Sequence, residues 1–97
     1  MMARVVWSPL AQVDLDDIWE YSFETWGLDQ AELYLEGIRL RAQHLLERHV
    51  PLTACDDIRK GYFRANIGSH IMFFVLDGGD IDVKRILHQS MDFQRHL

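Results

Sequence analysis

The sequence contains a single cysteine and no long apolar run, which argues against a disulfide-rich secreted domain and against a membrane-spanning protein. Because Cys55 has no partner for an internal disulfide, nothing indicates the disulfide framework of small secreted domains. The N-terminus lacks a charged segment followed by an apolar one, and no stretch approaches the roughly 20 apolar residues that a membrane span needs. We therefore expect a cytoplasmic protein without a membrane partner.

The chain also lacks an excess of positive charge, since its formal net charge is −5. Residues 1–50 hold four Lys and Arg against nine Asp and Glu, whereas residues 51–97 hold six of each kind. All of the net acidity therefore lies in the first half. Because general binding to a phosphate backbone needs a basic face, we expect no direct, sequence-specific nucleic-acid binding.

The common motifs of metal, cofactor and nucleophile sites are missing as well. The five histidines do not pair at i,i+4 on one helix with a third ligand in reach, and Cys55 stands alone. Gly78 and Gly79 are typical of a hairpin turn and do not form a phosphate-binding loop. We expect no metal, no cofactor and no nucleophile paired with its base.

What is present is the pattern of one folded α+β domain over residues 1–97, with an apolar fraction of 48%. A short strand around residues 5–7 precedes Ser8 and Pro9, which favour the start of a helix. This helix is expected to end at Gly27 in a left-handed cap. Its apolar face consists of Ala11, Leu15, Ile18, Trp19, Ser22 and Trp26.

A second helix is predicted from Asp29, which with Glu32 resembles a capping box, to about His49. Its wide apolar face belongs to the core. A narrower stripe lies opposite that face, and it either packs between the sheet and another helix or forms an exposed groove for a partner chain. The stripe consists of Leu33, Gly37, Leu40 and His44.

Residues 51–60 indicate a loop, and three strands follow it. Residues 61–67 alternate between apolar and polar side chains, whereas residues 71–76 are apolar throughout, as in a strand covered on both faces. The last strand begins at Ile81. The predicted fold is an N-terminal strand, a helical hairpin and a three-stranded antiparallel meander, with both helices on one face of the sheet.

Cationic side chains gather on the predicted strands. Arg64, Arg85 and His88 could hold a phosphate and donate a proton, as a nuclease without a metal would require. The alternative is that both arginines form ion pairs with nearby carboxylates, because surface ion pairs are common. The candidate partners are Asp56, Asp57 and Asp82.

The chain resembles the ParE branch of the RelE/ParE toxin superfamily over nearly its whole length. Five segments carry the resemblance, in order and with compatible spacing. They are D-L-D-D-I-W-E-Y at 14–21, W-G at 26–27, G-Y-F-R at 61–64, S-H-I-M-F-F-V at 69–75 and R-I-L-H-Q-S-M-D at 85–92. The resemblance implies the toxin of a bacterial type II toxin–antitoxin pair, neutralised by a ParD-type antitoxin.

The resemblance also implies a choice of target, because RelE-like members cut mRNA on the ribosome whereas ParE members are described as inhibitors of DNA gyrase. The acidic chain favours a gyrase-binding toxin that is not an enzyme. We expect its target-binding residues in the last segment, at Met91, Phe93, Arg95, His96 and Leu97. The antitoxin is expected on the stripe of Leu33, Gly37, Leu40 and His44, and the alternative nuclease would use Arg64, Arg85 and His88.

Overall fold

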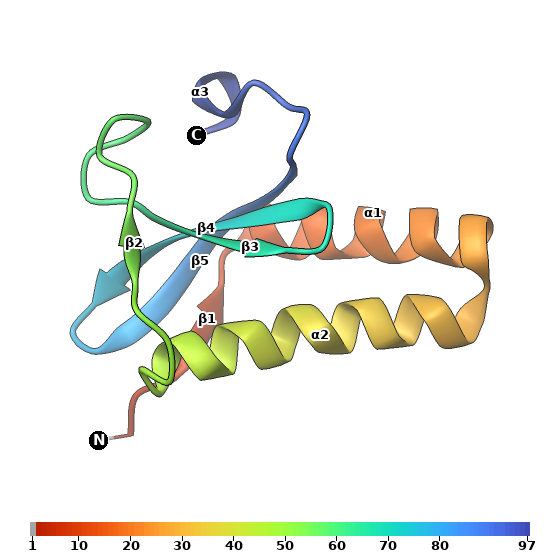
Figure 1. The fold of residues 1–97 in the computed structure, drawn as a ribbon, viewed down its shortest axis with the longest axis horizontal. Coiled ribbons are helices and arrows are strands. Elements are labelled where there is room, and N and C mark those ends of the chain that lie inside the picture. The colour runs from red at the N-terminus through yellow and green to blue at the C-terminus, as the bar shows by residue number, and fades with distance from the viewer. Residues whose placement is uncertain (1) are drawn as a thin grey trace.

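The computed structural model describes residues 2–97, which fold into five strands and three helices (Figure 1). In chain order these are β1 (Val5–Trp7), α1 (Pro9–Trp26), α2 (Leu28–Leu46), β2 (Thr53–Ala54), β3 (Phe63–Ile67), β4 (His70–Asp77), β5 (Asp80–His88) and α3 (Phe93–His96).

The strands form one sheet in the order β1-β5-β4-β3-β2. The antiparallel meander of β3, β4 and β5 confirms the prediction, and β1 adds to it in parallel beside β5. The assignment of residues 51–60 to a loop alone is wrong, because Thr53 and Ala54 pair with Arg64 and Phe63 of β3. A strand of two residues is too short to show an alternating pattern in the sequence.

The two long helices pack as a hairpin on one face of the sheet, as predicted (Figure 1). Ser8 caps α1 by accepting a hydrogen bond from the Ala11 amide at 3.2 Å. Gly27 is the one residue between α1 and α2. Its N–H donates to the Phe23 carbonyl of α1, and its carbonyl accepts a hydrogen bond from the Ala31 N–H of α2. Its φ of 91° requires glycine, but its ψ of 176° is extended, so the predicted left-handed cap is not the conformation found.

The start of α2 also differs from the prediction. The helix begins at Leu28 and ends at Leu46, and within residues 2–97 no side chain caps its N-terminus. Asp29 lies inside the first turn, so the predicted capping box with Glu32 is wrong. The one-residue connection at Gly27 leaves no room for a separate capping residue before the helix.

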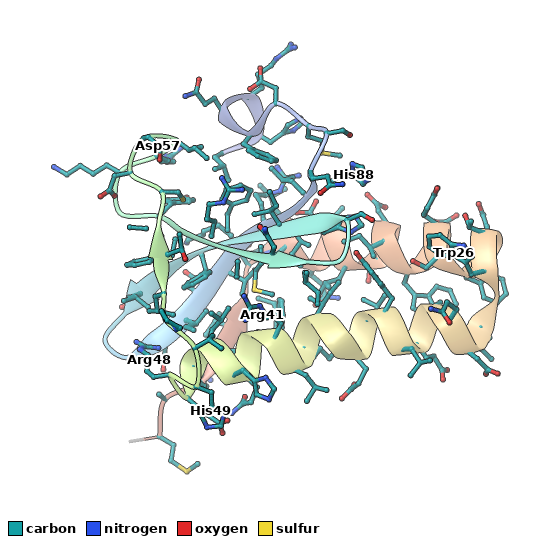
Figure 2. The ribbon with its side chains drawn as sticks, in the orientation of Figure 1. Trp26, Arg41, Arg48, His49, Asp57 and His88 are labelled. Atoms are coloured by element: carbon teal, nitrogen blue, oxygen red, sulfur yellow. The ribbon has the colours of Figure 1, made fainter. Side chains whose placement is uncertain are left out.

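The main core lies between the hairpin and the sheet, and most of the predicted faces of α1 and α2 contribute to it. Trp19 and Trp26 are exceptions, because both are exposed, Trp26 to 59% of its surface. Figure 1 shows that the closed end of the hairpin extends beyond the sheet, and Figure 2 labels Trp26 at this end, where no strand lies beneath it.

A second, smaller core covers the opposite face of the sheet. Its buried members are Cys55, Ile71, Phe73 and Leu87. Ile58 and Tyr62 pack against it from the segment after β2, and Phe93 and Leu97 do so from α3 and its end. β4 is therefore covered on both faces, as its uninterrupted apolar sequence predicts. Burial also raises the pKa of the Cys55 thiol and keeps it protonated.

A bulge in β5 changes which side chains face each core. Phe74 pairs with Val83 and Phe73 pairs with Arg85, so Lys84 is the extra residue. The residues of β5 that face the main core are therefore Ile81, Val83 and Ile86, with three positions instead of two between the last pair. Ile86 joins the main core and Leu87 joins the second one.

The pairing of β5 with β1 ends at Val83. From there on, Ser8 and residues of α1 form hydrogen bonds with the backbone groups at this edge of β5. Ser8 donates from its backbone N–H to the Val83 carbonyl and from its hydroxyl to the Lys84 carbonyl. The buried Asp14 carboxylate then accepts the Ile86 N–H at 2.9 Å. Side chains therefore satisfy backbone groups that a neighbouring strand would otherwise pair.

Asp14 also binds Arg85 through two hydrogen bonds of 2.8 and 2.9 Å. The contact raises the pKa of the Arg85 guanidinium, chiefly through these hydrogen bonds. The third nitrogen of Arg85 donates to the His96 carbonyl at 3.0 Å. We call this arrangement of Asp14, Arg85 and Ile86 the Asp14 clamp. It connects α1, β5 and α3.

Replacing Asp14 with Ala should destabilise the protein by about 3 kcal/mol, because it leaves the Arg85 charge and the Ile86 N–H without their partner. Urea denaturation followed by circular dichroism measures this change in the free energy of unfolding. The exposed Asp16→Ala on the same helix is the control and should change stability far less. Equal losses in the two variants would contradict the importance of the clamp.

Candidate functional site

Arg64 and Arg85 lie in one row across the sheet, each beside Phe73 of β4. The Arg64 guanidinium lies 5.9 Å from the centre of the Phe93 ring. Arg85 pairs with Asp14, so the predicted ion pairs with Asp56, Asp57 and Asp82 are wrong for this residue. Asp82 instead pairs with Lys84 at 2.8 Å and raises the pKa of that lysine.

His88 lies on the other face of the sheet from these arginines. Its ring contacts the His70 ring, with 5.4 Å between the centroids, and it lines a cavity together with Ile86 of the main core. The predicted convergence of Arg64, Arg85 and His88 is therefore wrong. The physical cause is the odd spacing of Arg85 and His88 in β5, because side chains alternate between the two faces of a strand. The bulge at Lys84 decides only that Arg85, and not His88, shares the face of Arg64.

The cavity beside His88 lies between α1 and the end of β5 and has a volume of about 370 Å³. We call it the α1–β5 cavity. It is lined by Asp14, Asp17, Ile18, Tyr21, His70, Ile86, His88 and Met91. Figure 2 labels His88 where β5 leads into the last segment. Helix α1, the sheet and the last segment therefore all contribute side chains to one cavity.

His70 connects this cavity to α2. Its Nδ1 lies 2.7 Å from the Tyr34 hydroxyl, which also accepts a hydrogen bond from the Ser69 N–H. Burial lowers the pKa of His70, and the neighbouring His88 lowers it further. The hydrogen bonds of Tyr34 fix the β3–β4 turn against the helical hairpin.

The predicted target-binding residues point in different directions. Phe93 and Leu97 are half-buried against the second core, with the Phe93 ring 5.0 Å from the Phe73 ring. An apolar sheet face needs a cover, and the Phe93 and Leu97 side chains provide part of it, so Met91 is the exposed apolar residue among the predicted target-binding residues. Met91, Arg95 and His96 are exposed.

The stripe on α2 lies at the surface, which decides between its two interpretations. Leu33 is 67% exposed and Leu40 is 49% exposed, so the stripe is not packed between the sheet and another helix. His44 is exposed as well. Gly37 lies at the margin next to β3, where an added Cβ would be 3.9 Å from Ile67.

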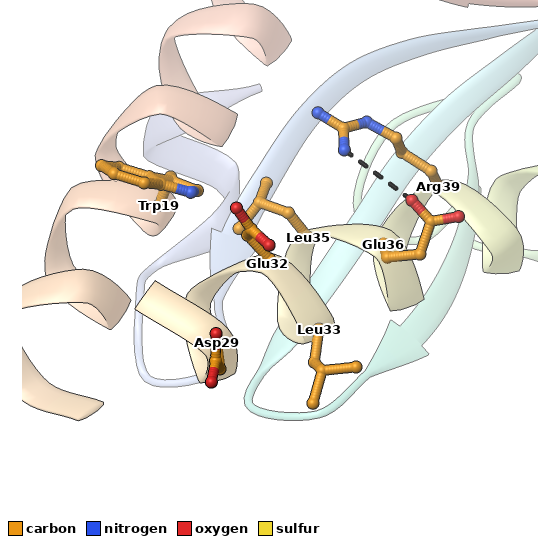
Figure 3. A pocket seen from close by; sticks show the side chains of 7 residues that line it. All are labelled: Trp19, Asp29, Glu32, Leu33, Leu35, Glu36 and Arg39. Atoms are coloured by element: carbon orange, nitrogen blue, oxygen red, sulfur yellow. Dashed lines mark ion pairs between the residues drawn. The ribbon is translucent and has the colours of Figure 1, made fainter. Parts of the chain in front are cut away.

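A groove of about 690 Å³ runs between the two long helices next to this stripe (Figure 3). We call it the hairpin groove. It is lined by Trp19, Asp29, Glu32, Leu33, Leu35, Glu36 and Arg39. Arg39 lies 4.0 Å from Glu36, and Trp19 stacks on Phe23 with 5.1 Å between the rings. The groove therefore combines an aromatic surface with three carboxylates and one cation.

Two further observations concern metals and membranes. Within residues 2–97, His, Cys, Asp and Glu side chains do not gather in groups of three that could hold a metal ion. None of the helices in this range has an apolar stretch long enough to cross a membrane.

Two solved structures with a similar fold come from toxin–antitoxin systems. The chromosomal ParDE system of P. aeruginosa matches with a TM-score of 0.74 at 20% identity, covering 91% of this chain and 96% of the other. A YoeB–YefM toxin–antitoxin complex from Staphylococcus aureus matches with a TM-score of 0.60 at 12% identity, covering 93% of this chain and all of the other. At these identities the likeness establishes the RelE/ParE-like fold.

Sequence similarity then establishes the family. The family model described as the ParE toxin of the type II toxin–antitoxin system, parDE, matches residues 5–93. The chain is 43% identical to Toxin ParE1 of Mycobacterium tuberculosis over the full length of both proteins. It is 37% identical to Toxin ParE1 of Caulobacter vibrioides over 90% of each. The chain belongs to the ParE toxin family of type II toxin–antitoxin systems.

The lowered pKa of His70 predicts a pH-dependent stability. The unfolded chain binds a proton on His70 at higher pH than the folded protein does, so the free energy of unfolding should fall as the pH drops through about 6.5. His70→Asn should make this decline shallower. Urea denaturation between pH 7.5 and 5.5 measures the free energy of unfolding of both proteins. If it declines with pH equally in the unmodified protein and in His70→Asn, His70 is not the group responsible.

Proposed function

We propose that this ParE-family toxin stops bacterial growth in the cytoplasm by binding DNA gyrase through its last segment, and that a ParD-type antitoxin neutralises it. The exposed segment that follows β5 carries the proposal. It ends in α3, whose Phe93 anchors it on the second core while Met91, Arg95 and His96 point to solvent. A fixed backbone with outward side chains loses little conformational entropy when it binds a partner.

The residues of this segment differ in exposure, and this difference indicates which of them can contact a target. Met91 is 44% exposed and lies at the rim of the α1–β5 cavity, so it is the apolar anchor available to a target. Arg95 is exposed and supplies a charge that can speed up association. Phe93 and Leu97 support the segment from beneath.

The structure does not favour the nuclease alternative. Arg85 uses its guanidinium to hold Asp14 and the His96 carbonyl, and His88 lies on the opposite face of the sheet from Arg64. A general acid must come within hydrogen-bond reach of the phosphate that the arginines would hold. The three side chains do not meet this condition.

We propose that the antitoxin binds along the stripe of Leu33, Gly37, Leu40 and His44 and continues into the hairpin groove. The two surfaces share Leu33, so one partner segment can cover both. Asp29, Glu32 and Glu36 outnumber Arg39 in the groove. An antitoxin segment with apolar residues for the stripe and Arg or Lys for the groove therefore complements this surface.

Met91→Ala should weaken gyrase inhibition by about tenfold, because it removes an exposed apolar anchor. Supercoiling by purified gyrase, titrated with the toxin, measures this effect. Gln94→Ala, an exposed position in the same segment, is the matched control and should inhibit like the unmodified toxin. Normal supercoiling at saturating unmodified toxin would show that gyrase is not the target.

Leu40→Glu should weaken the complex with the antitoxin encoded beside the toxin gene by at least tenfold, because it places a charge in an apolar contact. Isothermal titration calorimetry with the purified pair measures the affinity. Leu76→Glu, at an exposed leucine of β4, is the control and should bind normally. Unchanged affinity for Leu40→Glu would mean that the antitoxin binds elsewhere.

A further inference from the structure

The α1–β5 cavity extends the proposed target surface from the last segment onto α1. We infer that it receives an arginine side chain of the target protein, and that Asp17 and Tyr21 bind this side chain. This inference rests on the proposed function, since it assumes that the toxin acts by binding a protein target through Met91.

The geometry of the cavity fits one long side chain. Its apolar wall includes Ile18 and Ile86, and Met91 stands at the exposed rim. Tyr21 is 62% exposed, so the ring presents free surface to a partner. A volume of about 370 Å³ lies at the small end of the range for ligand pockets. The cavity therefore suits an anchoring side chain better than a whole helix or strand.

The charges around the cavity favour a cation. Asp14 and Asp17 are its two carboxylates, and Arg85 already neutralises Asp14. Asp17 forms no ion pair with any other side chain of residues 2–97. In that same range no Lys or Arg lines the cavity. An incoming positive charge would therefore meet the unneutralised Asp17 carboxylate.

The combination of groups favours arginine over lysine. A guanidinium is planar, stacks on an aromatic ring and binds a carboxylate through two hydrogen bonds, whereas an ammonium is a strongly hydrated point charge. Tyr21 offers the ring and Asp17, one helical turn earlier, offers the carboxylate. The apolar wall can pack against the methylene groups of the arginine.

This site is separate from the proposed antitoxin surface. Asp17 and Tyr21 point toward the cavity, whereas Trp19 lines the hairpin groove on another side of α1. Changes at Asp17 or Tyr21 should therefore leave antitoxin binding intact, which provides a test of folding in every variant.

The experiment compares Asp17→Asn, Tyr21→Ala and Tyr21→Phe with the control Glu20→Gln, an exposed carboxylate of α1 outside the cavity. Growth inhibition at titrated expression is the first measurement, and the affinity for purified gyrase is the second. Asp17→Asn and Tyr21→Ala should each weaken both by about tenfold. Tyr21→Phe should keep most of the activity, and Glu20→Gln all of it. Antitoxin affinity, measured for each variant, should not change.

The outcomes separate this inference from the proposed function. Full activity of both Asp17→Asn and Tyr21→Ala, with Met91→Ala impaired, would overturn the cavity as a binding site and leave the role of the last segment standing. Loss of activity in Tyr21→Ala with full activity in Asp17→Asn would overturn arginine as the occupant. If Met91→Ala is also fully active, the proposed target surface fails as a whole.

Discussion

The buried Asp14 carboxylate is the interaction on which the arrangement of the whole molecule depends. It accepts the Ile86 N–H of β5 and two hydrogen bonds from Arg85, which in turn holds the His96 carbonyl. One side chain thus satisfies a backbone group at a sheet edge and fixes α1, β5 and the last segment against one another. A carboxylate in this position is favourable only because all of its partners are present.

The sheet imposes a second constraint, because its central strand β4 is apolar on both faces. The helical hairpin covers one face, and the segment of residues 55–62 together with α3 covers the other. Phe93 and Leu97 are used as cover, which leaves Met91 as the exposed apolar side chain of the last segment. The proposed target surface therefore follows from the way the second core is closed.

Much of the fold follows from periodicity and turn chemistry in the sequence. The Ser8–Pro9 helix start, the meander and the apolar strand β4 are all of this kind. What local patterns cannot show is contact between distant residues. Asp14 lies among the apolar residues of α1, and only its position beside Arg85, 71 residues later, explains why it is buried. Trp26 belongs to an apolar helical face but lies where the hairpin extends past the sheet (Figure 2).

Local sequence patterns also predict only some features of the candidate site. Helical spacing predicts that Leu33 and Leu40 form a stripe, but their exposure depends on what packs against α2 and is seen only in the folded protein. The separation of Arg64 from His88 depends on the bulge at Lys84, which changes the alternation without an obvious local signal. The α1–β5 cavity combines side chains from α1, β4, β5 and the connection after β5, so no single segment of the sequence reveals it.

The central claim is that the toxin binds its target with α1 and the last segment together, and its antitoxin with α2. Amide hydrogen exchange of the toxin, alone and in complex with gyrase, tests this claim most directly. We expect gyrase to protect amides near residues 17–21 and 88–91 and to leave those of residues 33–40 unchanged. Protection confined to residues 33–40 would contradict it.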